Sequence, residues 1–537
     1  MTDSTPARLR SLPSVSPSDP EERRPPLAVV EPAPEPSSRR TVWLLLAVVV
    51  LPRLLLLPFN ENLYGDAVVR TDFAQRWAEH PHWIASYDDG AFQFGPLQIY
   101  LVGLVLKVGV PAELAGRLVS LVFGALTVLP LLALTRRLFG QKAALWACLA
   151  FSAWGMHLQM STTAGSEALS LFLVVSALAL FAEGLDENRF SPLLLSALVL
   201  NLAAATRYDT WLLIPLMTLL LLLGDKDRVA AITRGVLFGL LCLPFPLIWM
   251  QGNAMAKGDA LYPIHDIEQF HRNWVGSEMA ALSNLGFRLE SLFFWPGAAL
   301  VTLTPLVAFF GMVGMKRAWK ERPDVRWLLW VCWAPALYYV FKSVVLANFV
   351  PIARFTVTQV ALLLPFVEPG FRALTEQSRP GTKRTLTWAM VAVAVALPLW
   401  LGAFTFRSEG RAQDALRPVS PTSTNPPAVM QVASYLKHEV AEKGGSIILD
   451  EAPQYMDLQI RFFSGLPEAR TASHRFGDFD FQKHLKRLEP GYMVLADGGT
   501  LRKELALSHD GAVAKLGDRE FVEVPGFSAP YHVYKRR

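Results

Sequence analysis

Long runs of apolar residues recur along the chain and are separated by short polar segments. A run of about 18 or more apolar residues can cross the roughly 30 Å hydrocarbon core of a bilayer as a helix. The pattern predicts a polytopic α-helical membrane protein, with spans near 41–58, 115–135, 143–161, 165–182, 191–206, 209–223, 233–250, 292–314, 327–346, 353–369 and 385–406.

Residues 1–40 have a different pattern, rich in Pro, Ser and charged residues. Such a segment has little to bury, so we expect a disordered tail. A cleaved signal peptide would carry its apolar stretch nearer the N-terminus. Arg39 and Arg40 directly precede the first span, and this position favours a cytoplasmic N-terminus.

One apolar segment, GPLQIYLVGLVLKVGVP (95–111), is shorter than the others and carries Lys107. If it does not cross, the basic loops 136–142, 225–234, 315–326 and 371–384 all lie in the cytoplasm, as the positive-inside rule requires. If it crosses, the same loops lie outside. Charge therefore favours about 11 spans, with 95–111 in the outer interface, over a twelve-span topology.

The pattern changes again after the last span. The transmembrane domain is predicted at 41–406, with outer loops at 59–114 and 251–291, and a Pro-rich linker follows at 407–424. Residues 425–537 then combine a helical pattern with the apolar runs SIILDE and GYMVLADGG, which are typical of buried strands. We predict a small soluble α/β domain here, on the outer face.

Composition supports the membrane class, since 52% of the residues are hydrophobic and only 18% are charged. The net charge of +5 is explained by the basic loops, and no nucleic-acid-binding motif occurs. Cys148, Cys242 and Cys332 lie in apolar segments without a ligand spacing, so we expect neither disulfides nor a metal site. P-loop, GxSxG and HExxH motifs are also absent from the sequence.

Two acids stand where predicted spans meet the outer surface. Asp66, in NLYGDAVVR, is either a solvated loop acid or helix cap, or a general base that takes a proton from an acceptor. Glu167, in GSEALSLF, opens a span, where an acid is costly and often functional. The structural alternative for Glu167 is a first-turn acid favoured by the helix dipole.

Three arginines are candidates for holding a phosphate at the membrane surface. Arg207 lies in TRYDT between two spans, beside Tyr208 and Asp209, and Arg354 opens a later span. A guanidinium suits this role because its planar fork binds phosphate at two points and stays charged. Arg53, inside the first span, either extends to the lipid headgroups or approaches a lipid-linked substrate.

Other polar residues of the outer loops are candidates for substrate contact. They are Gln93, Tyr262, His265, Asp266, His271 and Arg272. The spacing of His265 and His271 matches no strong metal motif. Asp88 and Asp89, adjacent in a Gly-containing turn, are usual turn residues and only weak metal candidates.

Six segments in this order resemble the GT-C superfamily of membrane glycosyltransferases, in particular bacterial relatives of protein O-mannosyltransferases and of the lipid A aminoarabinose transferase. They are YGDAVVR (64–70), GPLQIYL (95–101), RRLFGQK (136–142), GSEALSLF (165–172), TRYDTWLLIP (206–215) and ARFTV (353–357). The resemblance covers about residues 40–410. It departs from the family at Gly95, which replaces the first Pro of a PPLYY-type element, and at Gln93 and Phe94, where some relatives have a basic residue.

The resemblance implies an inverting transfer of sugar from a polyprenyl-phosphate donor to a protein, glycolipid or cell-envelope glycan. Asp66 would be the base, Glu167 the second acid, and Arg354 and Arg207 the phosphate ligands. The active site and C-terminus would face outward from a bacterial inner membrane. Some distant relatives use a divalent metal, but this sequence has no convincing ligand set.

Two other functions are compatible with these residues. A transporter or flippase of lipid-linked sugars would usually show paired repeats with helices broken at the midplane, and no internal repeat is evident. An inactive scaffold would have no reason to retain Asp66, Glu167 and Arg354. We therefore favour the enzyme.

Overall fold

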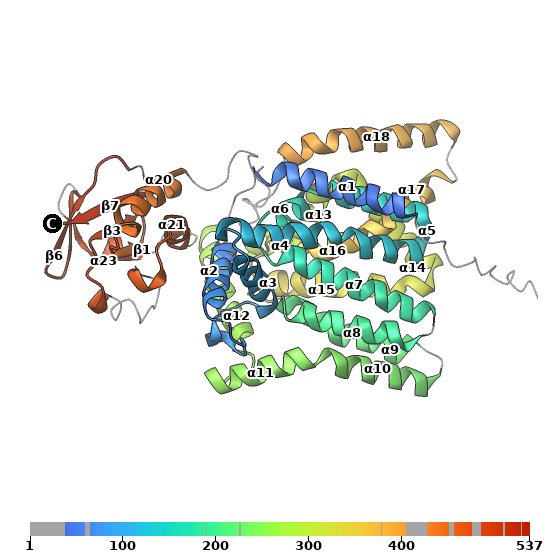
Figure 1. Ribbon diagram of the computed structural model, residues 1–537. Helices are drawn as coiled ribbons and strands as arrows, with labels where there is room; N and C mark the ends of the chain where they lie inside the picture. Colours follow the sequence, from blue (N-terminus) through green and yellow to red (C-terminus); the bar gives the residue numbers. More distant parts are fainter. Residues whose placement is uncertain are drawn as a thin grey trace, which may run out of the picture. The chain divides into compact units, whose positions relative to one another are not determined.

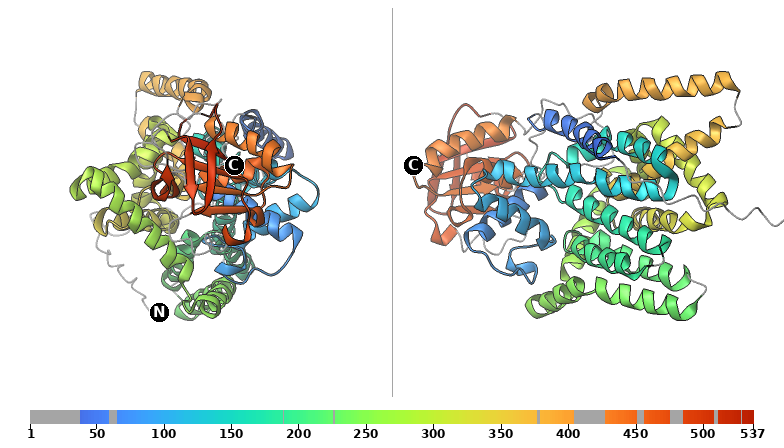
Figure 2. Two further views of the ribbon diagram at one scale, coloured as in Figure 1. Left: turned by 90° about the vertical axis from the view of Figure 1, so that its left-hand side faces the viewer. Right: turned by 45° about the vertical axis from the view of Figure 1, so that its right-hand side comes forward.

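The computed structural model consists of a helical region followed by one mixed sheet near the C-terminus (Figures 1 and 2). The described residues are 38–58, 65–187, 189–224, 227–376, 379–403, 427–450, 456–474, 485–507, 511–527 and 529–537. Most of the tail predicted at 1–40, and the linker predicted at 407–424, lie outside these residues.

The long apolar runs fold as helices, many of which lie roughly parallel in Figure 1. They are α1 (Arg39–Leu56), α4 (Ala112–Leu126), α5 (Val128–Ser152), α7 (Glu167–Asp186), α8 (Phe190–Ala204), α9 (Leu213–Gly224), α10 (Arg228–Cys242), α11 (Pro244–Lys257), α13 (Asn284–Leu303), α14 (Pro305–Glu321), α15 (Arg326–Val340), α16 (Val357–Leu363), α17 (Val367–Thr375) and α18 (Pro380–Ala403).

Further elements connect these helices, and several of them carry polar side chains. The helices among them are α2 (Gly65–Glu79), α3 (Pro96–Lys107), α6 (Gly155–Met160) and α12 (Tyr262–Leu282). The single turns are η1 (Tyr87–Asp89), η2 (Tyr208–Leu212), η3 (Pro323–Val325), η4 (Phe341–Val345), η5 (Ala353–Thr356) and η6 (Leu364–Phe366).

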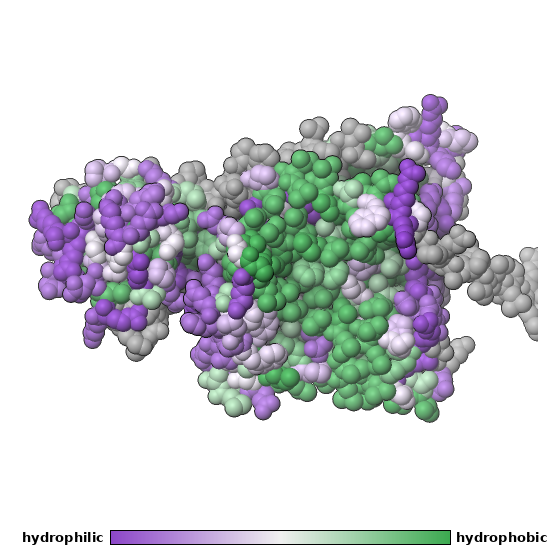
Figure 3. Space-filling model, viewed as in Figure 1, coloured by the Kyte–Doolittle hydropathy of each residue, from purple (hydrophilic) through white to green (hydrophobic). Residues whose placement is uncertain are grey.

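The helical region has the surface of a membrane protein. Figure 3 shows on one face a broad hydrophobic area flanked by hydrophilic residues. Within the described residues, three helical stretches are long and apolar enough to cross a bilayer, or up to five if each bent pair counts as one span. The three are Ala112–Ser152, Glu167–Asp186 and Pro323–Val345. The count of about 11 spans stays a prediction.

Two predicted spans are broken rather than continuous, and proline accounts for both breaks. The span predicted at 292–314 bends by 99° between α13 and α14, where Thr304 has φ of 71° and precedes Pro305. The span predicted at 233–250 bends by 44° between α10 and α11, directly before Pro244. Proline lacks the N–H of the helical ladder, so Pro305 and Pro244 each remove a backbone hydrogen bond at the break.

The short apolar segment at 95–111 forms α3, which has only 12 residues. At 1.5 Å per residue, a helix of this length extends about 18 Å, well short of the roughly 30 Å of hydrocarbon. Its length favours the prediction that this segment lies in the interface and does not cross.

Close helix packing depends on small residues. A Cβ added to Gly370 in α17 would lie 1.8 Å from the carbonyl oxygen of Phe310 in α14, and one added to Gly314 would lie 2.0 Å from that of Phe366. Small residues at a membrane helix crossing let the two backbones approach. The crossing of α14 with α17 therefore depends on both glycines.

The C-terminal residues form a seven-stranded sheet of order β2-β1-β3-β7-β6-β5-β4. The strands are β1 (Ile447–Asp450), β2 (Thr471–His474), β3 (Tyr492–Ala496), β4 (Ala506–Leu507), β5 (Val513–Leu516), β6 (Arg519–Glu523) and β7 (Tyr531–Arg536). β1 is parallel to β2 and β3, with Ile447 opposite Thr471 and Tyr492, and the other pairs are antiparallel.

Helices accompany this sheet: α20 (Pro427–Leu436), η7 (Lys437–Ala441), α21 (Met456–Ser464), η9 (Glu468–Arg470) and α23 (Thr500–Glu504). β1 and β3 confirm the strands predicted in SIILDE and GYMVLADGG, and both strands are buried.

Candidate active site

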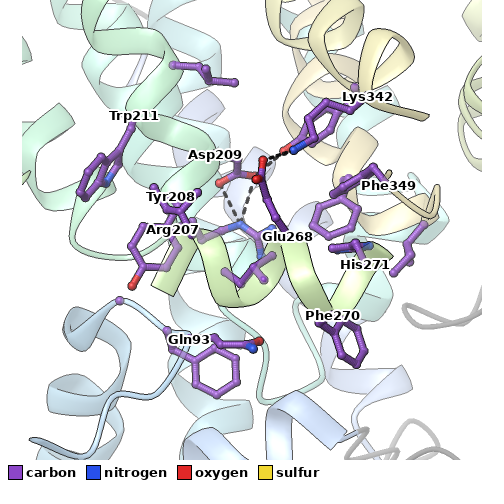
Figure 4. Close-up of a pocket in the computed structure, with 18 of the residues that line it drawn as sticks. Gln93, Arg207, Tyr208, Asp209, Trp211, Glu268, Phe270, His271, Lys342 and Phe349 are labelled. Carbon is purple, nitrogen blue, oxygen red and sulfur yellow. Dashed lines mark hydrogen bonds and ion pairs between the residues drawn. The ribbon is translucent and has the colours of Figure 1, made fainter. Parts of the chain in front are cut away.

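The helical region contains a cavity of about 610 Å³. Ligand pockets commonly have volumes of about 300–1,000 Å³. Its walls come from the start of α2, the chain before α3, η2, α12, and the segment that links α15 to η5 (Figure 4). These elements bring six sequence-predicted residues to one cavity: Asp66, Gln93, Arg207, Tyr208, His271 and Arg354.

A chain of alternating charges lies along this cavity. Arg354 Nη1 lies 2.8 Å from Asp66 Oδ2 and 3.6 Å from Glu167 Oε1. Arg207 Nη1 lies 2.7 Å from the same Glu167 oxygen, and Arg207 Nε donates to both carboxylate oxygens of Asp209. Glu167 is 3% exposed, so its two arginines compensate a carboxylate that would otherwise be costly to bury.

Asp66 is the exposed end of this chain. It lies in the first turn of α2, where the helix dipole favours a negative charge. Its side chain is 34% exposed and lines the cavity. A carboxylate in this position can pair with Arg354 and still accept a proton from a molecule bound in the cavity.

Arg70, one helical turn after Asp66, was not predicted as a site residue. Its guanidinium lies 3.8 Å from the centre of the Phe94 ring, and its Nη1 donates to Gln98 at 3.1 Å. The spacing of four residues in YGDAVVR was the signal that could have found it, because residues four apart share a helix face.

The position of Arg207 depends on close contact between the C-terminal end of α8 and the start of α3. The backbone N–H of Leu97 donates to the carbonyl of Ala205, and a Cβ on Gly95 would lie 2.3 Å from the same oxygen. Neither a Pro nor any other side chain fits at this point. The departure of Gly95 from the family pattern therefore has a structural reason.

Lys342 was missed although a lysine inside a predicted span is a functional signal by default. It lies in η4, where the helix adopts a π turn, and its ammonium pairs with Glu268 of α12 (Figure 4). The Lys342 side chain is 8% exposed and that of Glu268 is 33% exposed, and both line the cavity. π turns inside α-helices frequently occur at functional sites.

Gln93 and Tyr208 line the cavity and are also held by neighbours. Gln93 Nε2 donates to Asp266 at 2.8 Å, and Asp266 accepts a second bond from the Tyr87 hydroxyl at 2.9 Å. Burial and the Asp266 carboxylate raise the pKa of Tyr87, so its hydroxyl remains a donor. Tyr208 accepts from the indole of Trp249.

Other predicted contacts lie elsewhere. Arg53 is fully buried and donates to Val49, His157 and Ser161, and does not line the cavity. Neither Tyr262 nor His265 lines it. Tyr262 packs edge-on against Tyr87.

His265 and the two turn acids make contacts of their own outside the cavity. The His265 ring is exposed and lies 2.7 Å from Asp259. Asp88 pairs with Lys257, and Asp89 accepts from the backbone of Ala85. In the described part of the chain, no group of three or more His, Cys, Asp or Glu residues is arranged to hold a metal ion.

Comparison with known proteins places this geometry in context. A family model described as dolichyl-phosphate-mannose-protein mannosyltransferase matches residues 93–249. The structure of ArnT from Cupriavidus metallidurans bound to undecaprenyl phosphate is similar with a TM-score of 0.62 at 15% identity, covering 93% of this chain and 98% of that one. The chain therefore shares the fold of this structure over most of its length.

Oligosaccharyltransferase structures from Archaeoglobus fulgidus have a similar fold. One, in complex with Zn and sulfate, gives a TM-score of 0.54 at 15% identity over 84% of this chain and 68% of that chain. Another, AglB in complex with an inhibitory peptide and a dolichol-phosphate, gives 0.51 at 15% identity over 86% and 70%. No curated protein sequence matches the chain.

The family match covers only part of the chain of charges at the cavity. Glu167, Arg207 and Tyr208 lie within residues 93–249, whereas Asp66 and Arg354 lie outside. The fold, not the family match, brings these last two residues to the same cavity.

Proposed function

We propose that the protein is an inverting glycosyltransferase that moves a sugar from a polyprenyl-phosphate donor to an acceptor at the outer face of the membrane. The observation that carries the proposal is the ion pair of Asp66 with Arg354 at the edge of a cavity of suitable size. It supplies a carboxylate for proton removal beside a cation for phosphate. Similar structures contain undecaprenyl phosphate and a dolichol-phosphate, which supports this class of donor.

The chemistry needs one displacement. The acceptor oxygen or nitrogen attacks the anomeric carbon while the bond from that carbon to the phosphate oxygen breaks. The electron pair leaves with the phosphate, and the acceptor proton passes to Asp66. Arg354 and Arg207 stabilise the charge that develops on the phosphate, as preorganised cations do at other phosphoryl groups. Attack on the face opposite the leaving group inverts the anomeric centre.

The glutamate and the cavity wall have supporting roles. Glu167 orients both arginines through one oxygen, because each guanidinium contacts it. Tyr208 and Gln93 offer hydrogen bonds to the sugar or acceptor from the cavity wall. Orientation of two reactants in this way supplies several kcal/mol of barrier reduction.

We further propose that the site and the sheet domain face outward from a bacterial inner membrane. The basic loops support this orientation, as argued from charge. A protein, a glycolipid or a cell-envelope glycan would be the acceptor, and a hexose or pentose the sugar.

The decisive experiment is sugar transfer by purified, reconstituted protein with a panel of polyprenyl-phosphate sugars. Asp66→Asn should reduce turnover about 10²- to 10⁴-fold, the usual contribution of a general base. Glu79→Gln is the matched control, because Glu79 is an exposed acid on the same helix and does not line the cavity. Equal turnover in Asp66→Asn and wild type would remove Asp66 from the mechanism. Movement of lipid-linked sugar across the bilayer without transfer would instead support a flippase.

A further inference from the structure

The protonation and tautomer of His271, a histidine that lines the cavity, can be inferred from its surroundings. His271 lies on α12, is 4% exposed and lines the cavity (Figure 4). Its ring stacks on Phe349 with 4.2 Å between ring centres and an angle of 27°. This contact fixes the plane of the imidazole and leaves its two nitrogens in different surroundings.

The tautomer of His271 follows from one hydrogen bond. The backbone N–H of Val350 donates to His271 Nδ1 at 3.3 Å. An amide N–H can only donate, so Nδ1 carries the lone pair and the proton of the neutral ring is on Nε2. Within the described residues, no hydrogen bond to Nε2 is found, and Nε2 is not among the enclosed side-chain atoms that lack a partner. A donor that lines a cavity is therefore available for a bound molecule.

The ring is neutral at ordinary pH. Burial, together with the charges of Arg354 and Lys342, lowers the pKa of His271 to about 3. The Asp66 charge acts in the opposite direction. The imidazole thus lies within electrostatic range of both cations and of the proposed base, and its neutral form adds a donor without adding a third positive charge.

Lys342 is a second cation of the cavity that contains His271. Its partner Glu268 lies three residues before His271, on the same face of α12. An anion that approaches His271 therefore lies near two cations, Arg354 and Lys342. Arg354 forms ion pairs with Asp66 and Glu167, whereas the one ion pair described for Lys342 is with Glu268. The more exposed Glu268 can be displaced by a stronger anion.

We propose that His271 binds the donor through Nε2–H, as a neutral hydrogen-bond donor to a non-bridging phosphate oxygen located between Arg354 and Lys342. This inference rests on the proposed function, and it adds a contact to the leaving group. The phosphate gains negative charge as the sugar leaves, so the hydrogen bond strengthens toward the transition state. Removal of one such preorganised donor costs on the order of 10²-fold in turnover at other sites.

Two amide variants separate this role from a structural one. His271→Asn keeps an acceptor near the Nδ1 position for Val350 and loses the donor at Nε2. His271→Gln places an amide N–H near the Nε2 position and loses the acceptor for Val350. We expect His271→Asn to weaken binding of undecaprenyl phosphate about 10-fold and to reduce turnover about 10²-fold, whereas His271→Gln stays within about 3-fold of wild type.

The reverse order would overturn the proposal, because it would show that the bond to Val350 is what matters. Thermal unfolding in detergent shows whether each variant folds. If both amide variants unfold, His271→Phe retains the stacking on Phe349 and removes both nitrogens. Wild-type affinity for undecaprenyl phosphate in the folded Phe variant would also overturn the proposal, and a loss of about 10-fold would support it.

Binding measured without sugar transfer keeps this inference distinguishable from the proposed function. If wild type binds undecaprenyl phosphate but transfers no sugar from any donor, the enzyme assignment fails and the order of the variants still tests His271. If wild type does not bind undecaprenyl phosphate, both fail.

Discussion

The guanidinium of Arg354 lies 2.8 Å from the carboxylate of Asp66, although the two residues are 288 positions apart in the sequence. Arg354 comes from η5, after the chain leaves the π turn of η4, and Asp66 comes from the first turn of α2. The same Arg354 nitrogen lies 3.6 Å from Glu167. One cation therefore couples the proposed base to the buried acid of α7.

Replacement of Arg354 by Lys should reduce sugar transfer. An ammonium is a point charge and cannot reproduce the planar fork of a guanidinium. Loss of a hydrogen bond to a charged group costs about 1.5–3 kcal/mol, which corresponds to a decrease of about 10- to 150-fold in turnover. Steady-state rates with a saturating donor check this. A turnover equal to wild type, with only the acceptor KM changed, would place the phosphate elsewhere.

Glu167→Gln should destabilise the protein more than it perturbs any single step. Glu167 is buried and is shared by Arg207 and Arg354, so its neutralisation leaves two guanidinium groups without this charge partner. Breaking a buried ion pair by removing one partner costs about 3–5 kcal/mol. Unfolding in detergent should show the loss, and the double variant Glu167→Gln with Arg207→Gln should recover part of it. Full additivity of the two changes would contradict the coupling.

The sequence predicted the helical architecture well because a bilayer imposes one simple requirement, namely a long apolar run for each span. It also predicted β1 and β3, whose apolar runs are short and bounded by turn residues. The breaks at Thr304 and Leu243 were not predicted. Each lies inside an apolar run, and hydropathy alone does not distinguish a straight helix from a bent one.

Part of the candidate site was also predictable from the apolar pattern, because charged residues stand out against it. Asp66 and Arg354 were identified because a charged residue at the end of an apolar run is conspicuous. Lys342 was missed because its segment was counted as a membrane span. Arg53 was predicted as a phosphate ligand because it is a charged residue in an apolar run, and in the structure its guanidinium is buried and contacts His157. Which charges meet is a matter of tertiary packing, and no local pattern records it.

Gly95→Ala should impair both folding and the cavity. The added Cβ would lie 2.3 Å from the Ala205 carbonyl oxygen, and the backbone there leads directly to Arg207. Overpacking at such a contact costs about 1–3 kcal/mol, so both the unfolding temperature and the turnover should decrease. Gly381→Ala is the control, because nothing lies within 4 Å of a Cβ at that position. Wild-type stability of Gly95→Ala would show that the contact between the start of α3 and the end of α8 is loose.

The proposed outward orientation of the cavity can be tested with single cysteines. The three natural cysteines are buried, so they provide a quiet background for a membrane-impermeant maleimide. His265→Cys, at an exposed position in α12, should react in intact cells. Lys320→Cys, at the exposed end of α14 in a basic loop, should react only after permeabilisation. The opposite result would favour the twelve-span topology and reverse the face on which the cavity opens.

His271 should make stability depend on pH. Its pKa is about 3 in the folded protein and has the ordinary value of 6.5 when the chain unfolds. Between these values the unfolded chain binds a proton that the folded protein does not, so acidification from pH 6.5 toward 3 should lower the free energy of unfolding. The slope from one such group is at most about 1.4 kcal/mol per pH unit.

The variant His271→Phe lacks this titration and keeps an aromatic ring against Phe349. The stability of wild type relative to this variant, measured by unfolding in detergent, should therefore decrease from pH 7.5 to pH 5. A constant difference would show that the imidazole takes up a proton in the folded state as readily as in the unfolded chain, and an increase would show that it is already charged in the folded protein. Either result would remove the neutral donor from the site.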